Sequence, residues 1–349
     1  MAMYNNICLP CCSHPISVNL VDDDSDFLTD LSTCFSLDFF RYETSKSPKK
    51  LLAHLNKQYA GSPLVERVLQ ELPVGARGDK RIEVEGSTIY HEVKQLQRFE
   101  RVGIVIVDVQ MPEMDGVDFC KKLESPYIQK ILLTGTLSET DAIKALNEGV
   151  VHQVLYKEPT NMRAAVQEAL LRARWCYFAA LTRGLYGANS PYNINSAPQD
   201  LLCEKLLLQE MQRCDAVEHY LCDPRGTFLL VDAQGNSHAL FVRTAQQLQE
   251  SLKTPQAQSA NPQLLAQLQA SEQMLCYFHP AQTRLPEGDQ WEQYAHAASV
   301  FQGEQPLFYA CVPNAIAVAG LAPFCQYEQP QDAMGKAGQR LFVNRVTDQ

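Results

Sequence analysis

The chain has 349 residues, 46% of them hydrophobic, and a formal net charge of −10. This length favours two domains, because single hydrophobic cores stop growing at about 250–300 residues. The negative charge argues against non-specific binding to nucleic acid or another acidic polymer. The sequence has no apolar run of about 18 residues and no signal-peptide pattern at its start, so we expect no membrane segment. Its 12 cysteines form no regular framework, which favours a cytoplasmic protein with reduced thiols.

The first 14 residues concentrate residue types that bind metals. Cys8, Cys11, Cys12 and His14 offer donors for zinc or for a labile disulfide. A structural zinc site usually has a second pair of ligands, and none is evident in the sequence. We therefore expect residues 1–14 to form an irregular N-terminal arm that packs on the first domain.

Strand-like and helix-like segments alternate from residue 16 to residue 185, as in an α/β fold with a parallel sheet. The expected strands cover 16–21, 39–43, 102–108, 130–134 and 152–157, and the expected helices cover 26–36, 48–59, 115–125, 138–149 and 159–185. Ser138 is a candidate N-cap and Gly149 a natural helix stop. The long apolar-striped helix that begins at Pro159 exceeds what one domain must cover, so we expect it to help dimerisation or signal transfer.

Residues 61–103 separate the second expected helix from the third strand. They contain an expected helix at Pro63–Leu72, a Gly-rich turn and a second helix that starts near Thr88. Longer connections cost little closure entropy, about 0.6 kcal/mol per doubling. A structured insertion of this size more often adds function or an interface than slack.

The composition of residues 186–199 is that of a linker, and residues 200–349 form an expected α+β output domain. The expected helices cover 200–214, 245–252 and 262–272, and the expected strands are three within 220–244, one at 274–280 and one at 307–313.

Polar residues stand at the ends of four apolar runs of the first half. Asp22 and Asp23 follow ISVNLV, Asp108 ends VGIVIVD, Thr134 ends KILLT and Lys157 ends QVLYK. In an open parallel sheet the carboxyl ends of the strands share one edge, where ligands bind. Three carboxylates with an ammonium and a hydroxyl suit a divalent cation and a phosphoryl group, which points to phosphoryl transfer onto an aspartate.

The strings VDDD, VDVQMPEMDG, LLTG and YKEP, in this order, resemble the receiver domain of two-component response regulators. The resemblance covers about residues 15–183 and implies a flavodoxin-like, doubly wound parallel domain with an insertion, which we expect to span residues 15–185. The whole chain also resembles the response regulators of Legionella-type α-hydroxyketone quorum sensing. That likeness implies a phosphorelay protein that regulates virulence, motility or growth-phase switching.

The receiver resemblance implies a Mg²⁺ site. Asp23 matches the acid that binds the ion directly, and Asp22 matches its neighbour, which acts through water. Asp108 and the backbone carbonyl of Gln110 match the remaining protein ligands. Octahedral Mg²⁺ commonly takes a few carboxylates, waters and phosphate oxygens. Alone, the acids at 22–24 would equally read as a loop with a helix N-cap.

The same resemblance assigns the phosphoryl chemistry. Asp108 matches the phosphoacceptor, whose carboxylate attacks a phosphohistidine and becomes an acyl phosphate. Lys157 and Thr134 match the groups that pair with the phosphoryl oxygens. Taken alone, Lys157 reads as a solvated charge and Thr134 as an ordinary strand-end hydroxyl.

Three departures from the family pattern affect how phosphorylation is read out. Glu158 separates Lys157 from the proline that usually follows directly. Val154 occupies the position where the family usually has an aromatic switch residue. The spacing from Gly149 to Lys157 is one residue longer than usual. Tyr156 or His152 could take the switch role, although a core or an exposed side chain fits each equally well.

The second half shows no helix-turn-helix, P-loop or cyclic-dinucleotide-enzyme string. From Leu201 onward 9 Lys or Arg stand against 15 Asp or Glu, a net charge of −6, which disfavours DNA binding. A binding or interaction module and an unrecognised, nucleotide-processing enzyme both remain open. Groups that an enzyme could use are Asp223, Asp232, His219, His238 and His279. A simpler interpretation is that Asp223 and Asp232 are acids in hairpin turns.

The expected partners are a sensor histidine kinase or a phosphotransfer protein, and a second copy of the chain in a homodimer. Direct DNA binding and membrane binding are not expected. The alternative is an atypical receiver-fold scaffold that acts through protein contacts without phosphorylation.

Overall fold

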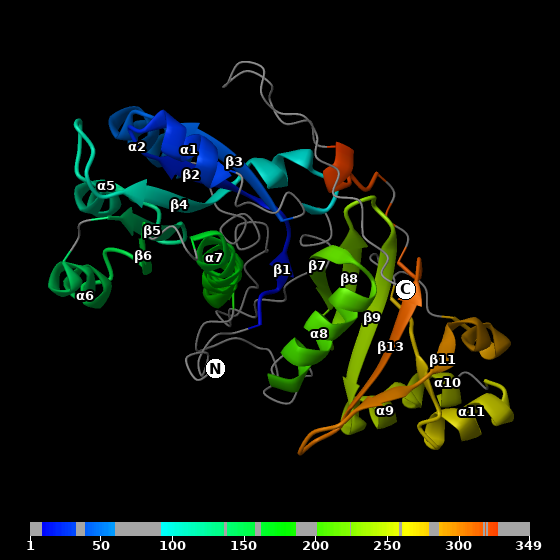
Figure 1. Ribbon diagram of the computed structural model, residues 1–349. Helices are drawn as coiled ribbons and strands as arrows, with labels where there is room; N and C mark the ends of the chain where they lie inside the picture. The colour runs from blue at the N-terminus through cyan, green and yellow to red at the C-terminus, as the bar shows by residue number, and fades with distance from the viewer. Residues whose placement is uncertain are drawn as a thin grey trace, which may run out of the picture.

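The computed structural model describes residues 9–32, 39–59, 92–135, 138–157, 162–185, 201–223, 225–257, 260–278, 286–316, 318 and 320–326. It contains a five-stranded parallel sheet in the first half and a six-stranded antiparallel sheet that dominates the second (Figure 1). The expected insertion helices at 63–72 and from Thr88, and the expected linker at 186–199, lie outside these residues.

The parallel sheet has the strand order β3-β2-β4-β5-β6, which is the flavodoxin-like order. Its strands are β2 (Ile16–Val21), β3 (Phe40–Ser45), β4 (Val102–Asp108), β5 (Gln129–Thr134) and β6 (Gln153–Tyr156). All four neighbouring pairs run parallel. The central strands β2 and β4 are almost continuously buried, as expected of strands covered on both faces.

Helices cover both faces of this sheet. They are α1 (Ser25–Ser32), α2 (Pro48–Tyr59), α5 (Gly116–Lys122), α6 (Glu139–Asn147) and α7 (Met162–Leu185). Side chains alternate along β4: Ile104 and Ile106 pack in the cluster with α1 and α7, whereas Val105 and Val107 pack with α2, α5 and α6. The fold class expected from the sequence, a doubly wound parallel domain, is therefore confirmed.

Local signals set the ends of α6 as expected. The Ser138 side chain accepts a hydrogen bond from the Asp141 backbone N–H, and Glu139 and Asp141 place acidic groups in the first turn. Gly149 follows the helix with a φ of 67°, a conformation that glycine adopts without strain.

The antiparallel sheet has the order β1-β7-β8-β9-β13-β12. Its strands are β1 (Cys12–Ser13), β7 (Ala216–Asp223), β8 (Thr227–Asp232), β9 (Ser237–Thr244), β12 (Ser299–Phe301) and β13 (Leu307–Pro313). A separate pair, β10 (Gln273–Leu275) with β11 (Ala295–Ala297), lies beside helices α9 (Ala245–Ser251), α10 (Lys253–Ala257) and α11 (Pro262–Gln269). Helix α8 (Leu201–Arg213) contacts β7, β9 and β13. The expected α+β character of this half is confirmed, although the strand expected at 274–280 is short.

The two halves share a core. Strand β1 pairs with β7, so the segment expected to be an irregular arm contributes a strand to the second sheet. One hydrophobic cluster contains buried residues of β2, β4 and α7 together with β7, β8 and β9. The face of α7 that we expected to serve dimerisation is thus largely buried within the chain, against β1, β4, β5 and β6.

Two buried arginines tie the halves together. Arg98, in a 3₁₀ helix at Leu96–Glu100, donates to both carboxylate oxygens of Glu218 on β7, each over 2.9 Å. Arg174 on α7 donates to the carbonyl oxygens of His14 and Val217. A buried guanidinium group that lost these hydrogen-bond partners would be strongly destabilising, so these contacts hold the halves in one arrangement.

Candidate functional site: the acidic edge of the parallel sheet

The polar residues that end the four apolar runs lie at one edge of the parallel sheet. Strands β2, β4, β5 and β6 are neighbours in this order, and all point the same way. Asp108 pairs with Leu133, which directly precedes Thr134, and Thr134 pairs with Tyr156, which directly precedes Lys157. The topology therefore brings together side chains that are up to 135 residues apart in sequence.

The three carboxylates converge. Each of Asp22, Asp23 and Asp108 places a carboxylate oxygen within 4.8 Å of the other two. Asp22 and Asp108 are buried, with 4% and 7% exposure, whereas Asp23 is exposed. Buried carboxylates at this separation repel one another unless a cation lies between them.

Lys157 supplies a cation at this position. Its ammonium lies 2.8 Å from Asp22 Oδ2 and 2.8 Å from Asp108 Oδ1. Burial lowers the pKa of Lys157, but the hydrogen bonds to Asp108 and Asp22 outweigh that effect and leave the pKa raised. The ammonium also lies 4.1 Å from the centre of the Phe27 ring, a cation–π contact. From the sequence, Phe27 is expected only to lie in the helix at 26–36, and no local pattern indicates this contact.

Backbone groups hold the carboxylates in place. Asp108 Oδ2 accepts from the Gln110 N–H over 2.8 Å, and Asp22 Oδ1 accepts from the Asp24 N–H over 2.9 Å. Gly116 packs against the backbone of Asp108 so closely that a Cβ would collide with it. The turn after Asp108 therefore fixes the carboxylate and excludes a side chain at Gly116.

The three acids at residues 22–24 have different roles. Asp24 accepts hydrogen bonds from the backbone N–H groups of Asp26 and Phe27, and these bonds lower its pKa. Asp24 thus caps α1, while Asp22 and Asp23 face the site. Both interpretations of this segment, N-cap and acidic site, apply to different residues within it.

Thr134 lies buried at the end of β5, and its carbonyl oxygen accepts from the Lys157 backbone N–H over 2.8 Å. Of the switch candidates, Val154 is half-buried on β6 and Tyr156 is exposed. His152 Nδ1 accepts from the Lys130 backbone N–H over 2.9 Å, which ties that ring to β5. Glu158 lies outside the described residues.

The groups that an enzyme in the second half could use do not converge. Asp223 accepts from the Thr227 hydroxyl and backbone N–H at one end of β8. Asp232 lies at the other end and accepts from backbone N–H groups of its own turn. His219 is fully buried, His238 lies on β9, and His279 is outside the described residues. The hairpin-turn interpretation of the acids is therefore the one that the structure supports.

The carboxylates at the edge fit Mg²⁺ by their chemistry. They are hard oxygen donors, two of them are buried and already turned toward a cation, and the third is open to solvent. In the N-terminal segment, Cys11, Cys12 and His14 are buried, and Cys8 lies outside the described residues. His14 Nδ1 lies 2.8 Å from the Pro15 carbonyl oxygen, and the described part of this segment forms no cluster of metal ligands.

Residues 66–167 match the family model of the response regulator receiver domain. This range contains Asp108, Thr134 and Lys157, and the parallel sheet adds the acids of β2 to them. The chain carries a receiver domain.

The receiver domain belongs to a larger shared fold. The response regulator LqsR of Legionella pneumophila has a structure that matches 94% of this chain and 98% of its own, with a TM-score of 0.74 and 24% identity. At this identity the likeness concerns the fold, and it includes the second, antiparallel half.

Two curated relatives match shorter stretches. A protein-glutamate methylesterase/protein-glutamine glutaminase of Hahella chejuensis is 34% identical over 94 residues, which are 26% of this chain and 25% of that protein. A similarly named protein of Geobacter metallireducens is 32% identical over 72 residues, 20% of each chain. The chain therefore aligns with a quarter or less of the length of these relatives. In the described part of the chain, no helix is long and apolar enough to cross a membrane.

Proposed function

We propose that this protein is a phosphorylation-dependent response regulator that accepts a phosphoryl group on Asp108. The observation that carries the proposal is the convergence of Asp22, Asp23, Asp108 and Lys157 at one edge of a receiver domain. The phosphoryl donor is a sensor histidine kinase or a phosphotransfer protein.

In the proposed reaction, Asp108 attacks the phosphorus of a phosphohistidine. An O–P bond forms, the N–P bond breaks, and the histidine leaves as neutral imidazole once it takes up a proton. Asp22, Asp23, Asp108 and the Gln110 carbonyl would hold Mg²⁺, which supplies positive charge against the carboxylates and the phosphoryl oxygens. Lys157 is held by both buried acids and can transfer one contact from Asp108 to a phosphoryl oxygen. The Thr134 hydroxyl would donate to another.

A labelling experiment tests this assignment. Phosphoramidate carries an N–P bond like that of phosphohistidine, so incubation with it and Mg²⁺ should phosphorylate the wild-type chain. Asp108→Asn should take up no label, because an amide is a poor nucleophile. Asp118→Asn is a matched control, since Asp118 is an exposed acid in the first turn of α5, the helix that follows Asp108 in the chain. The bound phosphate should be released by hydroxylamine, as expected of an acyl phosphate. Equal labelling of Asp108→Asn would contradict the proposal and favour the scaffold alternative.

Phosphorylation is proposed to strengthen homodimerisation through exposed apolar side chains of the receiver domain. Ile143 and Leu146 on α6, Tyr156 on β6 and Leu171 on α7 are exposed, and β6 contacts both helices. Lys157 directly follows Tyr156, so a phosphoryl group drawn to Lys157 acts beside this patch.

Sedimentation at several protein concentrations tests the dimer. The wild type should associate more tightly after phosphorylation, and Leu171→Asp should weaken association at least about tenfold, because it buries a charge in the patch. Leu208→Asp, at an equally exposed leucine on α8, should have no effect. A wild type that stays monomeric at tens of micromolar, both with and without phosphorylation, would contradict the proposed dimer.

The second half is proposed to act as a binding module without direct DNA contact. Its net charge of −6 and its internally paired acids support this assignment. The resemblance of the sequence to the response regulators of Legionella-type quorum sensing supports a place in a quorum-sensing circuit. A mobility-shift assay with phosphorylated protein at about 0.15 M salt tests the DNA prediction, since DNA-binding proteins rely on Lys and Arg contacts with phosphate. A sequence-specific shift at sub-micromolar protein would overturn it.

A further inference from the structure

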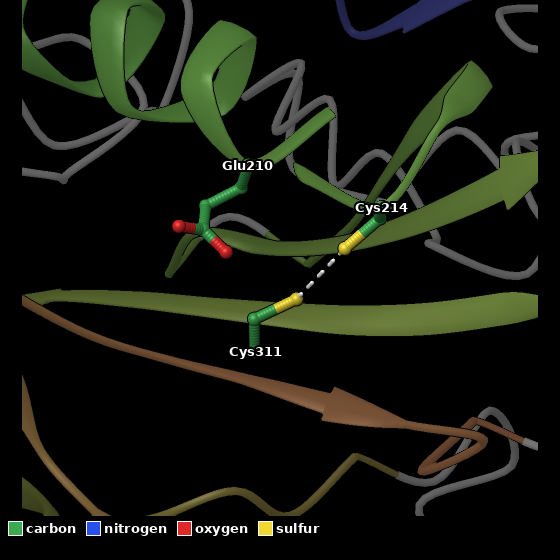
Figure 2. Close-up of side chains that lie close together, drawn as sticks. All are labelled: Glu210, Cys214 and Cys311. Carbon is green, nitrogen blue, oxygen red and sulfur yellow. Dashed lines mark hydrogen bonds between the residues drawn. The ribbon is translucent and has the colours of Figure 1, made fainter. Parts of the chain in front are cut away.

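A second group of metal-binding side chains lies in the antiparallel half, away from the acidic edge. Glu210 is on α8, Cys214 directly follows that helix, and Cys311 is on β13. Their ligand atoms all lie within 4.8 Å of one another. Figure 2 shows the two sulfurs facing each other with the Glu210 carboxylate beside them. The receiver chemistry uses none of these residues.

The backbone fixes this group from both sides. The Cys214 N–H donates to the Glu210 carbonyl oxygen over 3.0 Å, so the two residues are one helical turn apart and share a face. Cys311 pairs with Leu240 of β9. Strand β12 pairs only with Leu307–Tyr309 of β13, so the edge of β13 beside Cys311 is not covered by β12. The end of α8 and strand β13 therefore frame the site, and the partial exposure of Cys311 gives it an approach from solvent.

The distance between the sulfurs fits a shared metal ion. Cys214 Sγ and Cys311 Sγ are 3.7 Å apart. Two thiolates on a tetrahedral Zn²⁺, each at about 2.3 Å, lie about 3.8 Å apart. A disulfide needs about 2.05 Å, so the two sulfurs are not bonded to each other in this arrangement.

The carboxylate is already oriented. Both Arg213 contacts, from Nε at 2.8 Å and from a terminal nitrogen at 2.7 Å, go to Glu210 Oε2. Glu210 Oε1 takes no part in this ion pair. A cation that orients the outer oxygen of a ligating carboxylate is a common outer-shell arrangement. Two thiolates, one carboxylate, Zn²⁺ and Arg213 together carry no net charge, so occupancy does not bury an unpaired charge.

We propose that Glu210, Cys214 and Cys311 bind Zn²⁺ through two thiolates and one carboxylate, with the fourth position open to water. The two thiols release their protons when the ion binds, and no electron transfer is involved. Thiolate donors select this ion over Mg²⁺, which the all-oxygen acidic edge favours. The bound ion would link the end of α8 to β13 and so stabilise the second sheet.

Cobalt substitution tests the site on the full-length, reduced, metal-free chain. Co²⁺ should produce a thiolate-to-cobalt charge-transfer absorption at one equivalent, and Zn²⁺ should abolish it. The acidic edge contains no thiol and cannot produce this signal, so the test is independent of the phosphorylation proposal. Binding should release about two protons per ion at a pH below the thiol pKa.

Matched variants identify the ligands. Cys214→Ser and Cys311→Ser should each lose the charge-transfer absorption, and Glu210→Gln should weaken Co²⁺ binding at least about tenfold. Cys325→Ser, at an exposed cysteine, should behave like the wild type. Zn²⁺ should raise the Tm of the wild type and of Cys325→Ser but not that of Cys311→Ser, which also shows whether that variant is folded.

Three results would overturn the proposal. The first is a wild type without the absorption, and the second is an absorption that persists in Cys311→Ser. The third is a Cys214–Cys311 disulfide that forms with a mild thiol oxidant in a chain that shows no metal binding when reduced.

Discussion

The strand-end acids of the two halves are placed differently, although in both halves they follow apolar strands. In the parallel sheet, Asp22 and Asp108 end neighbouring strands and meet across a lysine. In the antiparallel sheet, Asp223 and Asp232 end successive strands and lie at opposite ends of β8. Parallel strands deliver their carboxyl ends to one edge, whereas hairpins alternate them. The same local pattern therefore predicts a shared site only where the topology is parallel.

The partners of these acids differ in the same way. Asp223 is bonded by the Thr227 hydroxyl and lies 3.9 Å from Arg243, and Asp232 is bonded by its own turn. The carboxylates of Asp223 and Asp232 therefore bind partners within the second half and have a structural role. At the acidic edge, by contrast, one lysine serves two buried acids and the third acid is exposed to solvent. Such an arrangement can bind a ligand, such as a divalent cation.

The largest expected effect concerns a charge whose role is structural. Glu218→Gln leaves the fully buried Arg98 without its counter-charge, so the free energy of unfolding should fall by about 3–5 kcal/mol. The uptake of phosphate per folded chain should not change, because Glu218 lies on β7 of the antiparallel sheet and takes no part in the contacts of Asp108. Urea unfolding and the labelling assay measure the two quantities.

A double variant serves as the control for Glu218. Arg98→Met with Glu218→Leu removes both charges and should recover part of the lost stability, since no buried charge remains unpaired, while the buried Tyr220 hydroxyl loses its acceptor. If Glu218→Gln unfolds at the same urea concentration as the wild type, the buried ion pair does not hold the halves together.

The second prediction compares one acid from each half. Asp23→Asn should weaken Mg²⁺ binding by about 10- to 100-fold, because it removes a carboxylate from the three-acid group. Asp232→Asn should leave Mg²⁺ affinity unchanged and cost about 1 kcal/mol of stability through its turn. Titration calorimetry and thermal unfolding would report both. Equal Mg²⁺ affinities in the two variants would remove the contrast between the halves.

Much of the receiver half follows from its sequence. Apolar runs of strand length, helix signals between them and polar residues at the strand ends predict both the sheet and the convergence of Asp22, Asp108 and Lys157. Alternation of strands and helices leaves few topologies open, since parallel crossovers have one hand. The prediction therefore needs only local patterns and one general rule.

Other features depend on contacts that local patterns do not encode. Arg98 and Glu218 are 120 residues apart, and Cys214 and Cys311 are 97 apart. The pairing of Cys12 with Tyr220, which makes β1 part of the second sheet, spans still more of the chain. A two-residue strand carries no periodicity, and a buried arginine looks like a surface arginine in sequence. Such contacts form only when two distant surfaces are already complementary.

The smallest expected effect, a pH dependence, probes the junction where β1 meets β7. The pKa of His219 is lowered to about 4, mainly by burial; the bond to the Pro10 carbonyl opposes this shift, and nearby Arg174 adds to it. His219 Nε2 lies 3.1 Å from that carbonyl oxygen, and Nδ1 is buried without a hydrogen-bond partner in the described structure. A second proton on the ring would therefore be buried without an acceptor.

The sign of the effect follows from the lowered pKa. The unfolded chain takes up a proton on this histidine near pH 6.5 and the folded chain only near pH 4, so stability present above pH 6.5 is lost as the pH falls toward 4. At pH 5 the loss from this residue should be about 1–2 kcal/mol relative to pH 7. Burial also lowers the pKa of His14, which adds a loss of the same sign. His219→Gln should reduce the stability difference between pH 7 and pH 5 by about 1–2 kcal/mol in urea unfolding. A pH 7 to pH 5 difference that is the same in the wild type and in His219→Gln would show that the junction does not exclude the charged ring.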